Sequence, residues 1–353
     1  MAEYIGFQPT DFFSTKLYTG NGTAIGSGGN AITGVGFQPD FTWIKQRDAS
    51  DNYILTDAVR GATKYVNSDR NNAEATNAES LTTWGADGFT LGNHAAVNGS
   101  GDTFASWNWK GGTTSGLVAG THSVNSYSYN ATSGFGIYQY TGDNTAGTIT
   151  HGLGAVPKMI ITKTLNSTVD WFVYHVTPGA GKYMVLNDTA AEGSSSIVWG
   201  NTTPTSTVFS LGAGAETNTS PNEYIAYVFA DVKGYSKFGS YIGAGSTDGT
   251  FIYTGFRPAY FLIKANYSGE PWLVWNNKTE GFNSVAAAST GNHRLTVSSD
   301  AAESDSSDID ICSNGIKIRS ADGHVGAGTY EYIYAAFAEF PIVSSNDVPT
   351  VAR

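Results

Sequence analysis

A ten-residue segment that occurs three times limits what this chain can fold into more than any other feature. In each copy a glycine lies three residues before a proline, and a lysine lies six residues after that proline. The glycine allows turn geometry that a side chain would disfavour, and the proline can open a strand but cannot donate a hydrogen bond within it. The residues in between are largely apolar or β-branched, which predicts a strand buried on both faces. The copies are residues 36–45, 154–163 and 255–264.

The sequence after these segments keeps the same register. A second apolar run begins with an aromatic residue eight positions after each lysine, at Tyr53, Trp171 and Trp272. This agreement predicts internal triplication, with equivalent core positions in each copy. Two sets of equivalent residues are therefore expected to be buried, namely Trp43, Ile161 and Leu262, and Trp109, Phe229 and Phe337.

The composition favours a β-rich protein. Charged residues make up only 14% of the 353 residues, whereas glycine alone occurs 43 times. Short strands joined by Gly- and Asn-rich turns are typical of all-β sandwiches and barrels. We predict an all-β fold of three tandem antiparallel β-sandwich-like (jelly-roll-like) repeats of about 100 residues each. The expected divisions are an arm at 1–12, repeats at 13–112, 135–236 and 237–341, a flexible Gly/Ser/Asn-rich linker at 113–134, and a tail at 342–353.

Charge and cysteine content exclude several classes of protein. The net charge is −11 and no run of Lys or Arg is present, which argues against a nucleic-acid partner. The single Cys312 excludes an intrachain disulfide framework and a cysteine-based zinc site. The N-terminus lacks the basic start and apolar block of a signal peptide, and no apolar run is long enough to span a bilayer. We therefore expect a protein that is made in the cytoplasm and does not insert into a membrane.

Several charged residues are candidates for chemistry, but structural roles are favoured for them. Lys45, Lys163 and Lys264 each follow a strand, where a lysine commonly reaches toward solvent and caps a turn or pairs with a nearby aspartate. Asp57 and Arg60 have the spacing of a local ion pair that fixes a loop.

The segment 298–310 is the one candidate for a cation site. It carries five acidic residues, and clustered carboxylates can hold Ca²⁺. Its spacing does not match the twelve-residue calcium loop, so a solvated acidic loop is favoured and calcium remains the alternative. The acidic residues are Asp300, Glu303, Asp305, Asp308 and Asp310.

Several longer stretches resemble a repeat found in virion structural proteins of tailed bacteriophages. They are GFQPDFTWIKQRD, TDAVRGATKYVNSD, ADGFTLG, FASWNWKGG and YIYAAFAEFP, and the resemblance covers nearly the whole chain. This repeat is common in marine and cyanobacterial phages, often in tail-fibre or other surface proteins. Its motifs are scaffold motifs, so no catalytic residue is carried over. The chain departs from the pattern at His175 and Asn276, which stand where the first repeat has Asp57.

The resemblance implies a virion protein that is synthesised in the host cytoplasm. We expect a tail-fibre or receptor-binding component that contacts a host-surface glycan or protein and other virion proteins, as a homo-oligomer with a trimer favoured. The alternative is a capsid or tail decoration or connector protein that holds neighbouring virion subunits together. A polysaccharide-degrading enzyme is the weakest class, because no matched pair of carboxylates stands out. No catalytic residue, cofactor or metal ligand is predicted.

Aromatic residues on loops or at strand ends are the candidate ligand contacts, because aromatic faces stack on sugar rings. They are Tyr127, Tyr129, Tyr267 and Trp275.

The N-terminal arm repeats the strand opener at Gly6-Phe7-Gln8-Pro9 but lacks the rest of a repeat. It cannot build its own core, and a free arm would expose apolar rings. Two arrangements would cover these rings, namely packing against the first repeat or docking onto another virion protein by strand addition. We expect docking for residues 1–9, including Phe7 and Pro9, and packing on the first repeat for Phe12 and Phe13.

Overall fold

The computed structural model describes residues 6–267, 269–279 and 292–339. Almost all of the regular structure is β-strand, as the composition predicted. The described helices are single turns: η1 (Pro9–Asp11), η2 (Ile25–Ser27) and α1 (Ala95–Asn98). No described helix is long and apolar enough to span a membrane.

Each repeat contains one main sheet built from four equivalent strands. In repeat 1 they are β1 (Phe13–Thr19), β3 (Phe41–Gln46), β4 (Ile54–Asp57) and β9 (Thr103–Trp109). In repeat 2 they are β11 (Phe135–Thr141), β13 (Pro157–Thr164), β14 (Phe172–His175) and β18 (Glu223–Ala230). In repeat 3 they are β19 (Ser236–Ile242), β21 (Pro258–Ala265), β22 (Leu273–Asn276) and β27 (Glu331–Ala338). The orders β1-β9-β3-β4, β11-β18-β13-β14 and β19-β27-β21-β22 are the same, and all pairs are antiparallel.

A small sheet packs on the outer face of each main sheet. In repeat 1 it consists of β2 (Asn30–Thr33), β8 (Gly88–Leu91) and β7 (Leu81–Gly85), in that order. In repeat 2 it consists of β12 (Gly147–Thr150) and β17 (Val208–Leu211). In repeat 3 it consists of β20 (Phe251–Tyr253), β26 (Gly315–Ile318) and β25 (Ile309–Cys312), in that order.

Further strands extend the main sheets or lie beside them. They are β5 (Lys64–Tyr65) and β6 (Ala75–Thr76), which pair with each other, β10 (Val124–Asn130), which pairs with β11, β15 (Lys182–Val185) and β16 (Gly193–Ser194), which follow β14, and β23 (Asn292–Thr296) and β24 (Ser304–Ser306), which follow β22.

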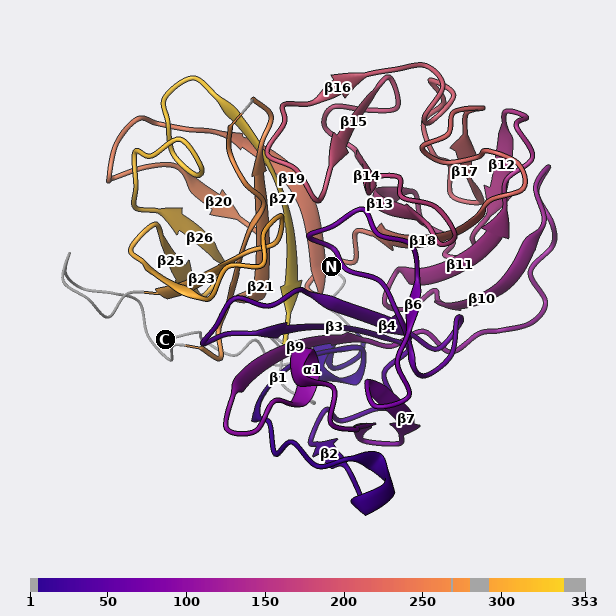
Figure 1. The fold of residues 1–353 in the computed structure, drawn as a ribbon. Coiled ribbons are helices and arrows are strands. Elements are labelled where there is room, and N and C mark those ends of the chain that lie inside the picture. The colour runs from indigo at the N-terminus through magenta and orange to yellow at the C-terminus, as the bar shows by residue number, and fades with distance from the viewer. Residues whose placement is uncertain (1–5, 268, 280–291, 340–353) are drawn as a thin grey trace.

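The inner faces of the three main sheets share one central hydrophobic core (Figure 1). Side chains alternate along a strand, so Trp43 of β3 enters this central core while its neighbour Ile44 packs against the small sheet of repeat 1. The same division holds for repeats 2 and 3, whose outer cores are separate from the central one. This double burial explains the continuous apolar pattern of the repeated segment. The repeats are therefore sandwiches that depend on one another rather than separate domains in a row.

Both predicted sets of core residues are buried. Trp109, Phe229 and Phe337 are at most 4% exposed, and Trp43, Ile161 and Leu262 are at most 3% exposed. The three aromatic residues of the first set meet at the centre, where the ring centroid of Trp109 lies 6.1 Å from that of Phe229 and 5.5 Å from that of Phe337. The register derived from the sequence is confirmed at these positions.

Equivalent hydrogen bonds join the repeats into a closed ring. The backbone N–H of a glutamate in each repeat donates to the carbonyl oxygen that lies two residues after the repeated lysine of the next repeat. Glu74 donates to Leu165 (2.6 Å), Glu192 to Asn266 (3.1 Å) and Glu303 to Arg47 (2.7 Å). The third bond connects repeat 3 back to repeat 1, so the arrangement has approximate three-fold symmetry.

Each of these glutamates also pairs with a basic residue ten positions earlier in the chain. The pairs are Lys64–Glu74 (3.3 Å), Lys182–Glu192 (2.9 Å) and His293–Glu303 (3.4 Å). The basic residue and the glutamate lie on neighbouring short strands or beside them, which holds the donating N–H in place. The ten-residue spacing is present in the sequence, but its role in joining neighbouring repeats depends on how the three repeats are arranged.

The segment expected as a flexible linker, 113–134, is partly a strand. Residues Val124–Asn130 form β10, which adds to the edge of the main sheet of repeat 2. Gly112 donates to the hydroxyl of Ser128 (2.8 Å), and Thr113 forms a bridge with Tyr129. The prediction of a flexible connector is therefore wrong for these residues, because their backbone pairs with that of β11. The predicted tail at 342–353 lies outside the described residues.

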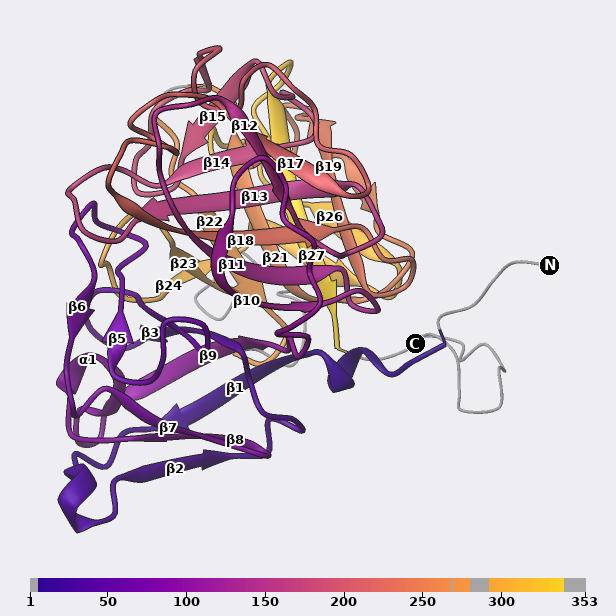
Figure 2. The ribbon, with the colours of Figure 1, turned by 90° about the vertical axis from the view of Figure 1, so that its right-hand side faces the viewer.

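The N-terminal arm packs on its own chain. Pro9 is buried, and the ring of Phe7 lies 4.9 Å from Phe12 and 5.6 Å from Tyr235, which connects repeats 2 and 3. The predicted docking of Phe7 and Pro9 onto another protein is thus not supported, since the central core already covers this apolar cluster. Phe13 is fully buried against Trp109, as expected. Figure 2 shows η1 beside the end of β27, so the two ends of the described chain lie on one side.

Candidate functional site

The three repeated lysines have the same structural role. Each side chain is fully buried, and its Nζ donates to the carbonyl oxygen of the next residue at 2.6–2.8 Å. The Nζ atoms of Lys45 and Lys163 also donate to a carbonyl in the following turn. The predicted turn-capping role is confirmed, whereas the predicted reach toward solvent is wrong. Burial lowers the pKa of each lysine to about 8, with nearby carboxylates opposing the shift.

These lysines make stability depend on pH. Their pKa in the folded protein is below the ordinary value of 10.5, so between about pH 8 and about pH 10.5 the unfolded chain binds more protons. Stability should rise with pH across this window, by roughly 1–2 kcal/mol per lysine between about pH 7 and about pH 9.5. Urea unfolding from about pH 7 to about pH 9, where tyrosine with its ordinary pKa of 10.0 is still mostly neutral, measures most of the rise. It should be smaller in Lys163→Met, and an unchanged slope in that variant would refute the assignment.

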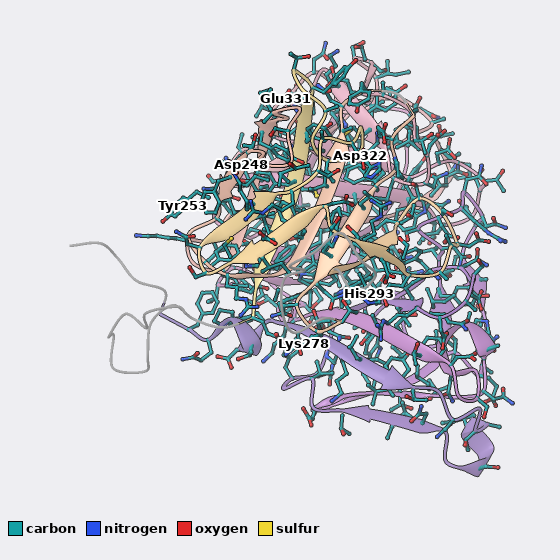
Figure 3. All side chains as sticks on the ribbon, turned by 90° about the vertical axis from the view of Figure 1, so that its left-hand side faces the viewer. Asp248, Tyr253, Lys278, His293, Asp322 and Glu331 are labelled. Carbon is teal, nitrogen blue, oxygen red and sulfur yellow. The ribbon has the colours of Figure 1, made fainter. Side chains whose placement is uncertain are left out.

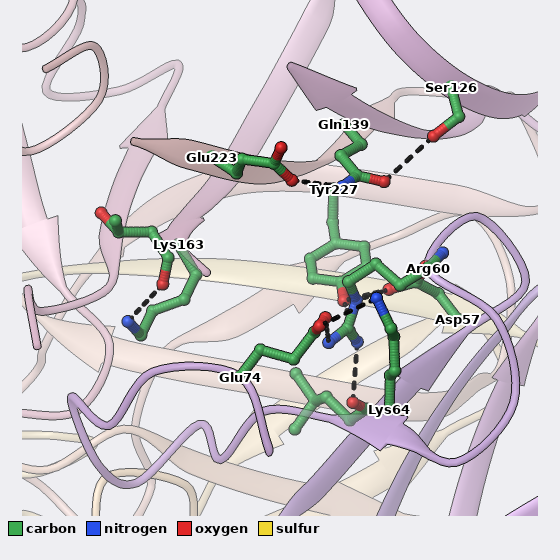
Figure 4. Close-up of polar contacts among 11 residues, drawn as sticks. Asp57, Arg60, Lys64, Glu74, Ser126, Gln139, Lys163, Glu223 and Tyr227 are labelled. Atoms are coloured by element: carbon green, nitrogen blue, oxygen red, sulfur yellow. Dashed lines mark hydrogen bonds and ion pairs between the residues drawn. The ribbon is translucent and has the colours of Figure 1, made fainter. Parts of the chain in front are cut away.

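Asp57 and Arg60 form a buried ion pair in repeat 1 that also contacts repeat 2 through Tyr227 (Figure 4). Arg60 Nε donates to Asp57 Oδ2 (2.6 Å), and the hydroxyl of Tyr227, on β18, donates to the same oxygen (2.8 Å). Arg60 also donates to Glu74 (3.2 Å) and to the Leu55 carbonyl (2.9 Å). Burial by itself would lower the pKa of Arg60, but the Asp57 carboxylate outweighs it and the pKa rises above its ordinary value. The pair fixes a loop, as predicted, and also joins two repeats.

The equivalent residue of repeat 2 makes a different contact across the next junction. His175 Nε2 lies 3.2 Å from the carbonyl oxygen of Tyr334 in repeat 3, and burial lowers the pKa of this histidine to about 4. The neutral ring is therefore the form present near neutral pH. His175 stands where repeat 1 has Asp57. It therefore makes a chemically different contact at the equivalent junction between repeats.

The five acidic residues of segment 298–310 do not gather into one site. Each lies within 4.0 Å of a basic nitrogen, and the partners are spread over repeats 1 and 3. The pairs are Asp300–Arg70, Glu303–Arg47, Asp305–His293, Asp308–Arg294 and Asp310–Arg319. Asp308, Asp322 and His324 do place ligand atoms within 4.8 Å of one another, but Asp308 is held by Arg294 and Ser306.

The structure separates the four aromatic candidates. Trp275 is fully buried in the outer core of repeat 3, so its selection as a ligand contact is wrong. Tyr267 is partly exposed, but its ring stacks on Tyr330 at 3.9 Å and its hydroxyl donates to the Gly323 carbonyl. Tyr127 and Tyr129 are half-buried on β10, with ring centroids 6.0 Å apart. Among these four aromatic residues, Tyr127 borders a hollow in the protein surface.

This hollow, here called the junction hollow, lies between repeat 1 and β10 and has a volume of about 320 Å³. That volume is at the lower end of the range for small-molecule sites. Tyr127 also borders a second, smaller hollow of about 150 Å³ beside Leu117 and Val118. The junction hollow is lined by Asp40, Ala58, Val59, Thr114, Asn125, Ser126, Tyr127 and Ser128.

Polar groups in the junction hollow are held in fixed positions. The Asp40 carboxylate accepts from the Gly111 N–H (2.9 Å) and from the Ser128 hydroxyl (3.0 Å). Burial raises the pKa of Asp40, and these hydrogen bonds oppose the rise. The Ser126 hydroxyl donates to Gln139 (3.0 Å), and Gln139 in turn donates to Glu223 (2.9 Å; Figure 4). Asn125 is exposed on the same strand and donates to Thr141.

The hollow combines a carboxylate, an amide and several hydroxyls, and Tyr127 borders it. The Tyr127 ring packs against the outer core of repeat 2, and its hydroxyl accepts from the Leu117 N–H (2.9 Å). Sequence reasoning found Tyr127 but missed Asp40 and Asn125, which are 85 residues apart in the chain. Asp40 follows the repeated proline and looks like part of the scaffold motif. Only the ring closure of repeats 1 and 2 brings it beside β10.

Comparison with known proteins gives one match. No curated protein and no solved structure matches the chain significantly. A family model described as a domain of unknown function, DUF7483, matches residues 8–341 in one stretch. That stretch spans all three repeats, in agreement with a structure in which the repeats share one core. The chain belongs to the DUF7483 family.

Proposed function

We propose that this protein is a non-enzymatic adhesion component on the surface of a phage particle and that the junction hollow binds a host-surface glycan. The chemistry of the hollow supports the ligand class. Asn125, Ser126 and Asp40 offer donors and acceptors for sugar hydroxyls, and Tyr127 borders the hollow beside them. The resemblance of the repeated segments to phage virion repeats supports the location.

The observation that supports this proposal most directly is that the polar groups line one hollow and are held in place by contacts from two repeats. Asp40 comes from repeat 1, whereas Asn125, Ser126 and Tyr127 come from β10 on repeat 2. A site positioned by rigid sheets loses little side-chain entropy on binding. The alternative, a decoration or connector protein, gains support from an open strand edge on repeat 3 that is described below.

A glycan array probed with the purified protein tests the ligand class. We expect Tyr127→Ala to lower binding at least tenfold and Tyr127→Phe to retain most of it, because phenylalanine keeps the packing of the residue that borders the hollow. Tyr330→Ala is the matched control, since Tyr330 is an exposed tyrosine on repeat 3 outside the hollow. Binding that is equal in Tyr127→Ala and the wild type would contradict the site. Antibody labelling of intact particles in electron micrographs tests the location separately.

A further inference from the structure

The strands β2, β12 and β20 form equivalent outer edges of the three small sheets, but the edges differ in whether another part of the chain packs against them. The buried residues Ile32, Ile149 and Ile252 occupy the same position on β2, β12 and β20. In repeat 2 the edge of β12 is covered by the chain itself. His122 N–H donates to the Thr148 carbonyl (3.0 Å), and Thr148 N–H donates to the hydroxyl of Thr121 (2.6 Å).

The contacts that cover this edge come from residues 120–122, which run antiparallel to β12. His122 lies opposite Thr148, and Gly120 lies close to both Thr148 and Thr150. A Cβ at Gly120 would lie 2.5 Å from the Thr148 carbonyl oxygen, so this position requires a glycine. The segment belongs to the long connection between β9 and β11, which also contains β10.

Repeat 3 has no such connection, because its chain passes from β18 to β19 within five residues, 231–235. Among the described residues, β26 is the only strand paired with β20. The bonds from Ile318 to Thr250 and from Thr254 to Asn314 show that the even-numbered residues face β26. The N–H and C=O groups of Phe251 and Tyr253 therefore point to the open edge.

The side chains beside this open edge are apolar and exposed. Phe251 is 44% exposed and Tyr253 is 60% exposed, and Ile242, whose carbonyl oxygen accepts from Thr250, is 52% exposed. Figure 3 shows Tyr253 at the outer border of repeat 3, away from the rest of the molecule. At the equivalent positions the other repeats have small residues, namely Ala31 and Thr33 on β2 and Thr148 and Thr150 on β12. An open edge with aromatic side chains is a template for strand addition.

Charges differ between the two ends of the open edge. At the Tyr253 end, Lys237 Nζ lies 5.3 Å from the centre of the Tyr253 ring and donates to the Tyr253 carbonyl (2.9 Å), and Arg257 is exposed four residues further on. At the Phe251 end, the highly exposed Asp248 pairs with Lys317 (2.8 Å) and lies 3.7 Å from Arg319, so charges of both signs offset one another there. Asp231 is the nearby acid on the Lys237 side, and its carboxylate holds the Phe238 N–H (2.8 Å).

We propose that β20 docks an extended segment of another protein, and that this segment pairs antiparallel with Phe251–Tyr253 and places an acidic side chain near Lys237 and Arg257. The geometry copies residues 120–122 on β12. A docked chain that continues in the same direction places its equivalent of residue 118 past Tyr253, toward the basic end. The acidic side chain matches the charge at that end, and the apolar rings are covered by the added strand. This inference is independent of the junction hollow.

Fluorescence anisotropy with two labelled octapeptides tests the proposal. Both have the sequence of residues 116–123, one with Val118→Asp and the other with Val118→Lys. The intact protein should bind the acidic peptide at least tenfold more tightly. Phe251→Pro should abolish binding, because it removes an N–H on the open edge while leaving the bonds to β26 intact. Phe251→Ala, which keeps that N–H, is the matched control and should bind with reduced affinity.

The remaining outcomes are also decisive. A protein with both Lys237→Glu and Arg257→Glu should prefer the basic peptide, which tests the charge assignment without relying on the proline variant. Equal binding of the two peptides, or no binding of either, would overturn the proposal. Self-association in analytical ultracentrifugation that is lost in Phe251→Pro would also overturn it, because the occupant would then be a second copy of this chain.

Discussion

Replacing Arg60 with leucine should destabilise the protein by about 3–5 kcal/mol, because it leaves the Asp57 carboxylate buried without its cation. Both side chains are completely inaccessible to solvent, and Asp57 would keep only the Tyr227 hydroxyl and the backbone N–H of Arg60 as donors. The loss would act on the contact between repeats 1 and 2 as well as on the loop after β4. Urea unfolding near neutral pH measures the difference.

Two further variants separate the buried charge from simple loss of packing. Arg70→Leu is the matched control, because Arg70 is about half exposed and its contacts with Asp69 and Asp300 are 3.8–4.0 Å long. We expect that change to cost no more than about 1 kcal/mol. The double variant Asp57→Leu with Arg60→Leu should recover a large part of the loss, since no unpaired charge remains. Equal destabilisation by Arg60→Leu and Arg70→Leu would show that the pair does not act as described.

Replacing Trp109 with alanine should cost about 3–5 kcal/mol through cavity formation. The indole is 1% exposed and lies where the inner faces of the three main sheets meet. Its ring centroid is 5.1–6.4 Å from those of Phe13, Phe41, Phe135, Phe229, Tyr260 and Phe337. The space left at this centre is only about 10 Å³, room for about one water molecule, so neighbouring rings have little freedom to refill it.

The destabilisation by Trp109→Ala should affect all three repeats together. Thermal unfolding followed by circular dichroism and by tryptophan fluorescence should show one coincident transition in both the wild type and Trp109→Ala, shifted to lower temperature in the variant. Trp84→Ala is the control, because Trp84 is only partly buried on the small sheet of repeat 1. Unfolding of repeat 1 alone in Trp109→Ala, with repeats 2 and 3 retained, would contradict a shared core.

The sequence by itself determined where the strands of the three repeated segments lie and in what register. The spacing from glycine to proline to lysine is local, and local geometry sets where a strand can start and end. The burial of Trp43, Ile161 and Leu262 follows from that register. The turn-capping role of the lysines follows in the same way, because each Nζ bonds to a carbonyl of the very next residue.

Only the tertiary structure decided how the repeats are arranged and which polar residues meet. The bond from Glu303 to Arg47 joins residues 256 positions apart, and the Asp57–Tyr227 contact joins residues 170 positions apart. Neither contact is specified by a local pattern. Aromatic side chains on buried and exposed faces also look alike in sequence, so Trp275 and Tyr127 could not be distinguished before their surroundings were known. Packing of the two sheets of repeat 3 buried Trp275, whereas the junction of repeats 1 and 2 placed Tyr127 at a hollow that Asp40 also lines. Burial depends on which faces pack together.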